Sequence, residues 1–530
     1  MNDKERNTLY TTIEIYRDSK EAALYFRDET IRFPTLLKRI DKMASLLASL
    51  GIKKDTVVAL LAPNVPETII ALYALSKIGA IISILHPLLP SEVLRESLTE
   101  TKATHFLVLD VLAYKYDDVI KDTEIKTYYL SPLPDLNPLI RPGFKLLYRK
   151  ELKSINPSNY LYKLKGEAKV ETNYDGLKPS LYLRSGGTTG KSKTVVLNEA
   201  GIVFVTKQSK DILQHETKGF SMIGLMPIFH GFGLAMGIHA PLSNDAASAL
   251  MISYNGKEIV KKIKQNKINV LLTIPYLTDK LLARKDFSGK KLQNLIATYI
   301  GADRPEKRLF DEFDKRMEEA SSSNRLLEGY GLTETATVNF VNTSKERKVT
   351  SVGKPLKGVK VKIVDPSSSY EIDLGPDKYG EILISSPSLC LGYLNTPEDK
   401  QPFYYDKNGE KWLKTGDIGY VDKDGFLFFK NRAKDVYKIA GYNVFPSEIE
   451  AFADEVKGVK TSAAIYHPDN RHPYFTLYVE SEREDTTSLE KEIREHLEKH
   501  LFRYSVPEKI VIVKNLPRTD IGKIDRKRLS

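Results

Sequence analysis

The stretch TVVALLAPNVPETIIALYALSKIGAIISIL, residues 56–85, decides the fold class. Its two ends, residues 56–62 and 80–85, are short runs of apolar side chains rich in Val and Ile, typical of buried strands. Between them, residues 67–77 form a longer apolar segment that predicts a buried helix. A strand, a helix and a strand in this order predict an α/β fold with a largely parallel sheet.

The same region contains the best candidate for a membrane span, residues 69–89. Lys77, Gly79, His86 and Pro87 interrupt this candidate, so a buried helix followed by a buried strand explains it better. The first twenty residues have no apolar core and do not resemble a secretory signal. We therefore expect no transmembrane segment.

The alternation of helices and strands continues on both sides of this stretch. On the N-terminal side we expect a helix at residues 34–50, ended by Gly51. On the C-terminal side we expect a helix at 91–101 and a strand at 104–110, then strands at 269–274 and 292–300 and an amphipathic helix at 307–320. Residues 131–180 show little periodicity and are expected to be irregular. The pattern predicts a large N-terminal domain of parallel-rich sheets with helices.

Beyond about residue 355 the pattern changes to short strands and tight turns. Strands at 359–364 and 380–384 and the Asp-Lys-Asp-Gly turn at 422–425 predict a β-rich subdomain. A compact α+β segment follows, with helices at 447–456 and 488–501 and strands at 461–466 and 474–480. We expect two domains, residues 1–433 and a small mobile domain of residues 434–530.

Composition limits the classes of function. The 530 residues are 41% hydrophobic and 28% charged, as in an ordinary globular protein. The single cysteine, Cys390, excludes a disulfide framework and a Cys-rich zinc site, and fits a reducing compartment such as the cytoplasm. The net charge of +11 is compatible with anionic ligands or a peripheral contact with an anionic membrane, and equally with a solvated lysine-rich surface. No nucleic-acid-binding module is recognisable.

The stretch SGGTTGKSK, residues 185–193, resembles a P-loop at its end but fails the pattern G-x-x-x-x-G-K-[ST]. Ser185 stands where the first glycine belongs, and the following residues 194–197 favour a strand over a helix. The stretch therefore predicts a loop between two strands, at 180–184 and 194–197, with Asn198 capping the next helix. Its glycines and hydroxyl groups suit phosphate binding, although a polar loop without a ligand explains them too.

Four further stretches complete a pattern that extends over nearly the whole chain. They are EGYGLTE (residues 328–334), KTGD (414–417), NRAKDVYKIAG (431–441) followed by FPSEIE (445–450), and PRTDIGK (517–523). Together with residues 185–193, in this order and spacing, they resemble the adenylate-forming superfamily of acyl-CoA synthetases, adenylation domains and luciferases. The closest pattern is that of the acyl-CoA synthetases.

The resemblance implies an ATP site. Attack of a carboxylate on the α-phosphorus of ATP brings two anions together, so the site has to neutralise charge and fix the geometry. The implied nucleotide-binding residues are Ser185, Gly186, Gly187, Thr188, Thr189, Gly190 and Lys193 for the phosphates, Gly301, Ala302, Asp303, Tyr330 and Gly331 for adenine, and Asp417 and Arg432. Thr333 would contact the α-phosphate, and Glu334 would bind Mg²⁺.

The resemblance also implies a two-step mechanism with a moving domain. Lys523 would be the mobile catalytic cation of the first step, and Lys434 the hinge about which the small domain turns. In the turned state, Lys438 and Gly441 would approach the active site, where Gly441 leaves room for the pantetheine arm of CoA. Taken singly, each of these residues is also explained as an ordinary turn or surface residue without a role in catalysis.

Residues in further segments indicate the class of the acyl group and of its acceptor. Amino-acid-activating members carry an aspartate where MPIFH (226–230) has His230, so a substrate ammonium would lack its partner. The small residues Gly231, Gly233, Ala235 and Gly237 suit an apolar tunnel or, equally, tight helix packing. Pro446 and Arg518 are more typical of CoA ligases than of peptide-synthetase domains, and no carrier domain fits between Lys523 and Ser530.

We therefore expect an acyl-CoA synthetase that uses ATP, Mg²⁺ and CoA to activate a hydrophobic carboxylic acid such as a fatty acid. The alternatives are an acyl- or aryl-AMP ligase that loads a separate carrier protein, and a non-catalytic nucleotide-binding homologue. We expect a monomer or homodimer in the cytoplasm. Arg184, Ser192, Thr194 and Asn431 depart from the family pattern and leave the loop geometry and the subfamily open.

Overall fold

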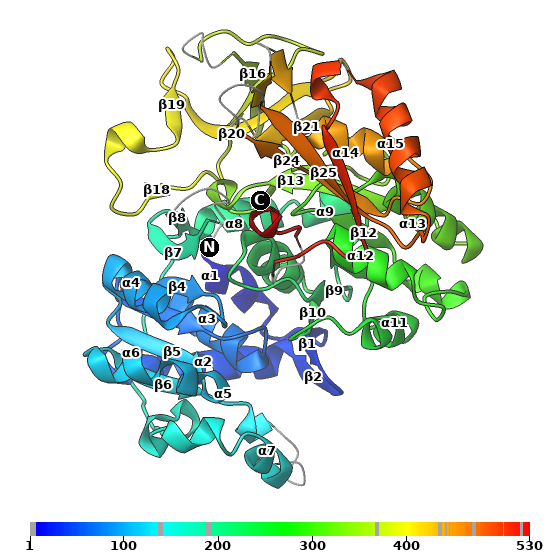
Figure 1. The fold of residues 1–530 in the computed structure, drawn as a ribbon. Coiled ribbons are helices and arrows are strands. Elements are labelled where there is room, and N and C mark those ends of the chain that lie inside the picture. The colour runs from blue at the N-terminus through cyan, green and yellow to red at the C-terminus, as the bar shows by residue number, and fades with distance from the viewer. Residues whose placement is uncertain are drawn as a thin grey trace.

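The structure is a computed structural model that describes residues 7–135, 141–185, 193–365, 370–432, 437–439, 442–444, 446–468, 473–501, 503–519 and 523–529. Two large sheets and a β-rich subdomain form the large N-terminal domain, and a small α+β domain lies above the two large sheets and next to the β-rich subdomain (Figure 1). The predicted fold class, α/β with a β-rich subdomain and a small C-terminal domain, is confirmed.

One large sheet has seven strands, and the opening stretch of the sequence lies at its centre. In spatial order the strands are β18 (Gly392–Tyr393), β8 (Thr194–Asn198), β7 (Pro179–Arg184), β4 (Ile81–Leu85), β3 (Val57–Leu61), β5 (His105–Leu109) and β6 (Lys126–Leu130). The strands from β7 to β6 are parallel, whereas β8 and β18 run antiparallel to their neighbours. The predicted βαβ unit is present, because α3 (Pro66–Ile78) connects the parallel strands β3 and β4.

The other large sheet has nine strands. In spatial order these are β15 (Lys354–Pro355), β14 (Val338–Val341), β13 (Leu326–Gly331), β12 (Ala297–Ile300), β11 (Val270–Thr273), β9 (Ser221–Gly224), β10 (Ala247–Leu250), β1 (Ala22–Phe26) and β2 (Glu29–Arg32). The strands from β13 to β1 are parallel, and the strands at both edges are antiparallel. Parallel strands end at one edge of a sheet, which is where α/β proteins place their ligands.

Helices cover the two large sheets. They are α1 (Leu9–Ile13), α2 (Phe33–Ser49), α4 (Ser91–Thr101), α5 (Asp110–Ala113), α6 (Asp117–Asp122), α7 (Arg141–Leu147), α8 (Glu199–Thr206), α9 (Ser209–Leu213), α10 (Ala240–Leu242), α11 (Gly256–Lys264), α12 (Pro275–Leu282) and α13 (Lys307–Glu319), besides α3. The apolar helix α3 is buried on nearly all sides, and Gly79, with φ +81°, ends it in the left-handed conformation that favours glycine. The predicted cap on α8 is also present, because the Asn198 side chain accepts from Gly201 N.

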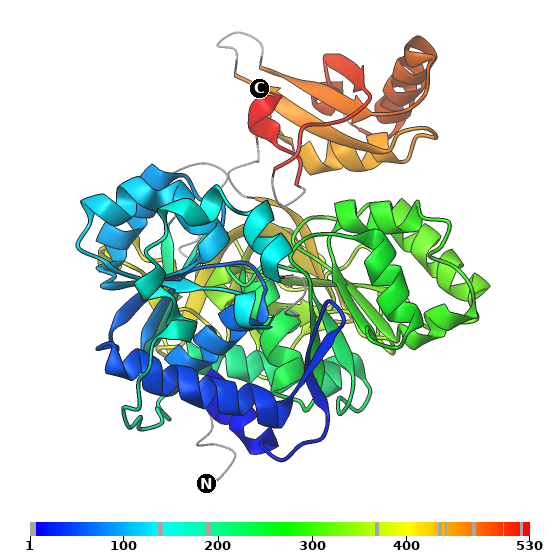
Figure 2. The ribbon, with the colours of Figure 1, turned by 90° about the horizontal axis from the view of Figure 1, so that it is seen from below.

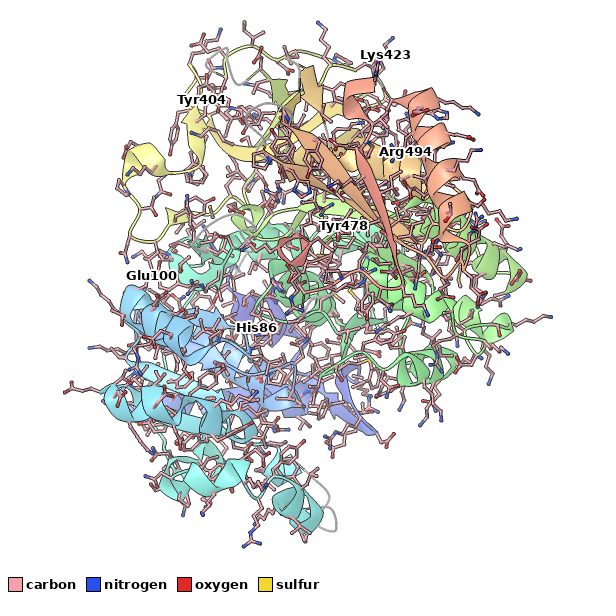
Figure 3. The ribbon with its side chains drawn as sticks, in the orientation of Figure 1. His86, Glu100, Tyr404, Lys423, Tyr478 and Arg494 are labelled. Atoms are coloured by element: carbon pink, nitrogen blue, oxygen red, sulfur yellow. The ribbon has the colours of Figure 1, made fainter. Side chains whose placement is uncertain are left out.

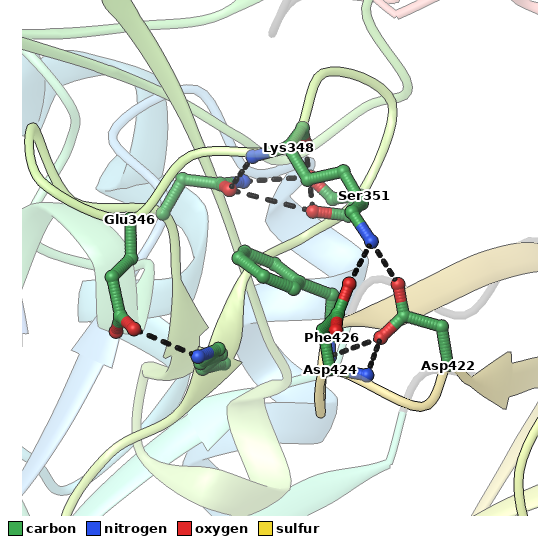
Figure 4. A network of polar contacts seen from close by, with 8 residues as sticks. Glu346, Lys348, Ser351, Asp422, Asp424 and Phe426 are labelled. Carbon is green, nitrogen blue, oxygen red and sulfur yellow. Dashed lines mark hydrogen bonds and ion pairs between the residues drawn. The ribbon is translucent and has the colours of Figure 1, made fainter.

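The β-rich subdomain is an antiparallel sheet. Its strands are β16 (Lys360–Val364), β17 (Gly380–Ser385), β20 (Lys411–Val421), β19 (Phe403–Tyr405) and β21 (Leu427–Arg432). Lys348 binds the turn between β20 and β21, since its Nζ contacts the carboxylates of Asp422 and Asp424, the latter at 2.9 Å (Figure 4). This contact connects the β20–β21 hairpin to the body of the large domain.

The small domain has its own core. Strands β24 (Thr461–His467), β25 (Tyr474–Glu480) and β26 (Lys509–Val513) pack against α14 (Pro446–Asp454) and α15 (Thr486–His500), and β22 (Tyr437–Ile439) pairs with β23 (Tyr442–Val444). Ile449, Leu477 and Ile493 are fully buried in this core. Seen from below, the domain forms a separate layer beside the large one (Figure 2).

Two expectations were wrong in detail. The strand expected at 292–300 is shorter, because residues Lys290–Asn294 form a 3₁₀ helix and the strand is Ala297–Ile300. The region expected to be irregular contains the short helix α7, which has no buried residue and therefore no apolar face that the sequence could show. Within the ranges that the structure describes, no helix is both long and apolar enough to cross a bilayer.

Candidate active site

A loop and a strand meet at the carboxyl edge of the parallel part of the nine-stranded sheet. Parallel strands β12 and β13 are in register at Ile300 and Glu328, so the loop Gly301–Asp303 that follows β12 lies beside the end of β13, which contains Tyr330. A Cβ added to Gly301 would lie only 3.3 Å from the carbonyl oxygen of Gly329, and Ala302 has φ +67°. The two predicted adenine-binding segments are therefore adjacent, with their backbones in close contact.

Tyr330 connects this edge to the β-rich subdomain. Its hydroxyl donates to Oδ2 of Asp417 in β20, and its ring lies 6.0 Å from that of Phe429 in β21, at an interplanar angle of 27°. Gly331, the next residue, is exposed. The arrangement fixes an aromatic ring next to the Gly301–Asp303 loop.

Asp417 is fully buried, and its carboxylate has two partners. Besides the Tyr330 hydroxyl, Nε of Arg432 lies 2.8 Å from Oδ1, since the two residues pair across β20 and β21. Burial raises the pKa of Asp417 to about 6, although Arg432 and the Tyr330 hydrogen bond lower it. The carboxylate of Asp417 therefore lies where the β-rich subdomain meets the nine-stranded sheet.

Glu334 lies next to the C-terminal end of the predicted phosphate loop. The Tyr393 hydroxyl donates to Oε1 of Glu334 at 2.8 Å, and Nζ of Lys193 lies 4.4 Å from the centre of the Tyr393 ring. Thr333, one residue before Glu334, is partly exposed at the start of a 3₁₀ turn. Two predicted segments from distant parts of the sequence, Thr333–Glu334 and Lys193, therefore come together here through Tyr393, which was not predicted.

The loop itself begins and ends between antiparallel strands, as predicted. Ser185 N donates to Lys193 O at 2.8 Å, and Lys193 N donates to Ser185 Oγ at 3.1 Å, which closes the base of the loop between β7 and β8. A P-loop would continue into a helix, whereas this loop continues into strand β8. Gly186, Gly187, Thr188, Thr189 and Gly190 lie outside the described residues.

Lys523 reaches this site from the small domain. Residues 517–519 and 523–525 pair with each other, with Thr519 N donating to Lys523 O at 2.7 Å and Asp525 N to Pro517 O at 2.8 Å. Burial lowers the pKa of Lys523; the nearby Asp303 carboxylate acts against this, and the nearby Arg432 guanidinium adds to it. The predicted catalytic lysine thus lies close to the adenine loop and to Arg432.

His230 is also close to Lys523. The pKa of His230 is lowered to about 4, first by burial and then by the charges of Lys523 and His86. The ring of Phe229 lies between the two histidines, 4.4 Å from His86 and 4.6 Å from His230. His86 directly follows β4 (Figure 3), so the end of the seven-stranded sheet contributes to the same region. His230 is therefore neutral at physiological pH.

The small residues after His230 serve close packing. A Cβ at Gly231 would lie 1.9 Å from Ala336 O, and one at Gly233 would lie 2.1 Å from Pro227 O. The segment Phe232–His239 forms a π-helix, a feature frequent at functional sites. Of the two explanations considered for these glycines, tight packing accounts for Gly231 and Gly233.

The carboxylates present suit one kind of metal ion. Over the described ranges, no group of three or more His, Cys, Asp or Glu side chains is placed to hold a metal. Glu334 offers a single carboxylate next to the phosphate loop. Mg²⁺ is commonly held by one or two carboxylates together with substrate phosphates and water, so Glu334 fits that ion.

The remaining predicted residues are not placed against the site. Lys434 and Gly441 lie outside the described residues. Lys438 lies in β22, where its backbone pairs with that of Asn443. Their predicted roles stay predictions.

Several contacts of the site were not predicted. Glu100 of α4, labelled in Figure 3, accepts from the Thr194 hydroxyl at 2.8 Å, and Arg184 contacts Ser97 on the same helix. The two unusual residues next to the phosphate loop therefore share α4 as their partner. Nothing in the sequence pairs them with a helix about ninety residues earlier.

The sequence profile described as "AMP-binding enzyme" matches residues 14–394, and that described as "AMP-binding enzyme C-terminal domain" matches residues 448–523. The chain is 28% identical over 513 residues to a 2-succinylbenzoate–CoA ligase of Listeria monocytogenes serotype 4b (strain F2365), covering 96% of each chain. It is 26% identical over 527 residues to a long-chain-fatty-acid–CoA ligase of Bacillus subtilis (strain 168), covering 96% of this chain and 91% of that protein.

Among solved structures, the ATP-bound RpMatB–BxBclM chimera B3 superposes with a TM-score of 0.85 at 21% identity. The match covers 99% of this chain and 98% of the chimera, so both domains share its fold.

Proposed function

Because this chain belongs to the AMP-binding enzyme family of adenylate-forming enzymes, we propose that it is an AMP-forming acyl-CoA synthetase. It activates a hydrophobic carboxylic acid with ATP to an acyl-adenylate, releasing pyrophosphate. It then transfers the acyl group to CoA, giving acyl-CoA and AMP. Both relatives described above bear the name of a CoA ligase.

The observation that carries this proposal is the position of Lys523. A lysine from the small domain is half-buried close to Asp303, Arg432 and His230, which come from three separate segments of the large domain. Burying an ammonium group is unfavourable unless anions surround it. ATP and a carboxylate would supply those anions.

In the first step, a carboxylate oxygen attacks the α-phosphorus of ATP, and the bond from that phosphorus to the bridging oxygen of pyrophosphate breaks. Both reactants are anionic, so Lys523 lowers the barrier by neutralising charge between them. Thr333 donates to the α-phosphate. His230 is uncharged because its pKa is about 4, so it does not attract the substrate carboxylate away from the lysine.

In this proposal, the nucleotide is held by residues of the large domain. Tyr330 and the Gly301–Asp303 loop face adenine, and Asp417 accepts from the ribose hydroxyls with Arg432 beside it. Residues Ser185 to Gly190, with Lys193, hold the outer phosphates. The carboxylate of Asp417 already accepts a hydrogen bond from the Tyr330 hydroxyl, and the same group suits the two ribose hydroxyls as an acceptor.

Glu334 would hold Mg²⁺ at the phosphates. When bound, the ion neutralises phosphate charge and orients the leaving pyrophosphate. The Tyr393 hydroxyl fixes the orientation of the Glu334 carboxylate through its 2.8 Å hydrogen bond.

In the second step, the thiol sulfur of CoA attacks the acyl carbonyl carbon and the bond to AMP breaks. We propose that residues 434–530 turn about Lys434 relative to residues 1–433, which withdraws Lys523 and brings Lys438 and Gly441 to the site. The small domain has its own core and so can move as one body.

The acid is hydrophobic and carries no ammonium group. Where amino-acid-activating members present an aspartate, the neutral ring of His230 lies against Phe229. The two relatives named above act, by their names, on a long-chain fatty acid and on 2-succinylbenzoate. We propose a fatty acid as the substrate, with an aromatic acid as the alternative.

A panel of carboxylic acids tests the proposal. Fatty, aryl, dicarboxylic and amino acids are each supplied with ATP and Mg²⁺, and pyrophosphate release is measured with and without CoA, followed by detection of the thioester. Release with fatty acids and thioester formation are expected. If an acyl-adenylate accumulates and CoA is never acylated, the protein loads another acceptor; if no acid releases pyrophosphate, it is not a ligase.

We further propose that the enzyme works in the cytoplasm as a monomer or homodimer without a nucleic-acid partner. The single cysteine, Cys390, fits a reducing compartment. Light scattering during gel filtration measures the oligomeric state.

A further inference from the structure

The short helix α7 is unusual because it exposes its apolar side chains. None of its seven residues is buried, and Leu146 and Leu147 are 72% and 73% exposed. Other helices of the large domain bury their leucines, as Leu36 and Leu37 of α2 show. Two adjacent exposed leucines on one helix indicate a surface that is covered by something else in the working protein.

Helical turns continue beyond α7. Tyr148 N donates to Phe144 O and Leu152 N to Tyr148 O, both at 3.0 Å, and a 3₁₀ helix follows at Glu151–Ser154. The rings of Phe144 and Tyr148 pack on each other with centroids 4.7 Å apart. Residues 141–153, called the basic helical segment, therefore consist of α7, a hydrogen-bonded turn and the start of a 3₁₀ helix.

The segment is strongly basic. Between residues 141 and 153 there are five cationic side chains and one acidic side chain. Four of the cations are exposed and lie on both sides of the two leucines in the sequence; they are Lys145, Arg149, Lys150 and Lys153. The fifth, Arg141, donates to Pro134 O at 2.9 Å, which anchors the start of the segment.

We propose that the basic helical segment docks the enzyme on the surface of an anionic lipid bilayer. Leu146 and Leu147 would enter the boundary between head groups and acyl chains, while the flanking Lys and Arg side chains bind the phosphates of the lipids. Apolar side chains flanked by cations are the pattern of helices that lie in a membrane interface. Long Lys and Arg side chains can extend their charges to the head groups while their stems stay apolar.

A protein partner fits the segment less well. A stable protein interface buries about 800 Å² on each side, with apolar residues at its centre. Here only two leucines are prominently exposed, and closely spaced cations surround them. A cluster of like charges is a poor centre for a protein interface and a good match for a sheet of anionic phosphates.

The position of the segment is compatible with catalysis at the membrane. In Figure 1, α7 lies at the lower end of the molecule, whereas the small domain lies at the upper end. Docking through α7 would leave the small domain away from the bilayer. The docking uses no active-site residue and so does not depend on the activity proposed above.

Vesicle flotation tests the docking. The wild-type protein is mixed at low ionic strength with vesicles of equal parts phosphatidylglycerol and phosphatidylcholine, or of phosphatidylcholine alone. It is expected to float with the anionic vesicles only, and to be released at high salt because exposed charges are then screened. Wild-type protein that stays in the aqueous fraction with both kinds of vesicle would overturn the proposal.

Two variants localise the contact. Replacing both leucines (Leu146→Ser with Leu147→Ser) and, separately, replacing the four exposed cations by Gln should each lower the bound fraction roughly tenfold or more. The matched controls are Ile372→Ser, at an isoleucine that is 60% exposed in the β-rich subdomain, and a variant with four other exposed lysines replaced by Gln. Those lysines are Lys38, Lys42, Lys491 and Lys499.

The controls decide between specific and general attraction. Both controls should float like the wild type. If the four-lysine control loses binding as strongly as the cation variant, the attraction is due to overall charge, and the proposed site is wrong. If the leucine variant floats unchanged but a wild-type dimer becomes a monomer, the face binds a second copy of the chain, and the proposal is also overturned. Circular dichroism checks that each variant is folded.

Discussion

Arg432 and Asp417 face each other across the antiparallel strands β21 and β20, with Nε of Arg432 2.8 Å from Oδ1 of Asp417. Arg432 also lies close enough to Lys523 for its charge to lower the pKa of that lysine. The same guanidinium therefore contacts the proposed ribose acceptor and influences the proposed catalytic cation. In the sequence it is two residues before Lys434, the proposed hinge.

Asp417→Asn should increase the stability of the folded protein and weaken its binding of ATP. Burial raises the pKa of Asp417 to about 6, from 3.8 for an exposed aspartate. The folded state thus binds this proton more tightly than the unfolded state, and its stabilisation is lost as the pH rises from about 4 to about 6. Asparagine removes the buried charge, so at pH 8 the variant should be more stable on the order of 2 kcal/mol.

Thermal unfolding of both proteins between pH 4 and pH 8 measures this difference, which should vanish near pH 4. ATP binding by calorimetry should weaken in the variant. A variant that is less stable than the wild type at pH 8 would show that the pairs with Arg432 and Tyr330 outweigh the cost of burial.

Tyr393→Phe should lower the affinity of the enzyme for Mg²⁺, so that pyrophosphate release needs a higher Mg²⁺ concentration. The tyrosine hydroxyl orients the Glu334 carboxylate, and loss of such a supporting hydrogen bond commonly lowers metal affinity by about tenfold or more. Pyrophosphate release is titrated with Mg²⁺ at fixed ATP. Tyr405→Phe, at a tyrosine 55% exposed in β19, is the control, and an unchanged magnesium dependence of Tyr393→Phe would argue against Glu334 as the ligand.

Tyr276→Ala should separate the two half-reactions. The Arg518 guanidinium of the small domain lies 4.9 Å from the centre of the Tyr276 ring in α12, so this contact stabilises the arrangement in which Lys523 is in the site. Losing a contact of this kind should slow adenylate formation roughly three- to tenfold. Thioester formation from a preformed acyl-adenylate should be unaffected.

Tyr276→Phe keeps the ring and should behave like the wild type in both assays. Equal slowing of both half-reactions by Tyr276→Ala would mean that the contact supports the fold and does not favour one domain arrangement.

His230→Ala should weaken the binding of the carboxylic acid more than the binding of ATP. The imidazole lies against Phe229 and near Lys523, and it contributes to the proposed acyl pocket as a neutral group. The KM for the acid should rise about tenfold while the KM for ATP changes little. In the wild type, the rate should show no ionisation attributable to His230 between pH 5 and pH 8, because its pKa is about 4. A matching rise in both KM values would contradict a role in acid binding.

The fold could be predicted because local patterns and global architecture agree. The central βαβ unit, the helix α4 at residues 91–101 and the β20–β21 hairpin all followed from apolar periodicity and turn residues. The errors have physical causes. Leu292 and Leu295 are buried, as a strand would require, but they lie in and next to a 3₁₀ helix that packs on the core. Helix α7 has no buried face, so no apolar periodicity marks it.

The candidate site could be predicted in part. The motifs identified Tyr330, Asp417, Glu334 and Lys523, and the structure brings them to one region of the molecule. The Tyr393 bond to Glu334 and the Thr194 bond to Glu100 join segments 59 and 94 residues apart, and only the folded chain shows such contacts. The unusual residues Arg184 and Thr194 are likewise explained only by the folded chain, in which they contact Ser97 and Glu100 of α4.

The central claim is that Lys523 supplies the cation for adenylate formation. Carboxylate-dependent pyrophosphate release by Lys523→Ala tests it most directly, with Lys514→Ala, an exposed lysine of the same domain, as the control. We predict a decrease of at least about a hundredfold for Lys523→Ala, with ATP binding largely retained and the control unchanged. Pyrophosphate release at the wild-type rate in Lys523→Ala would contradict the account.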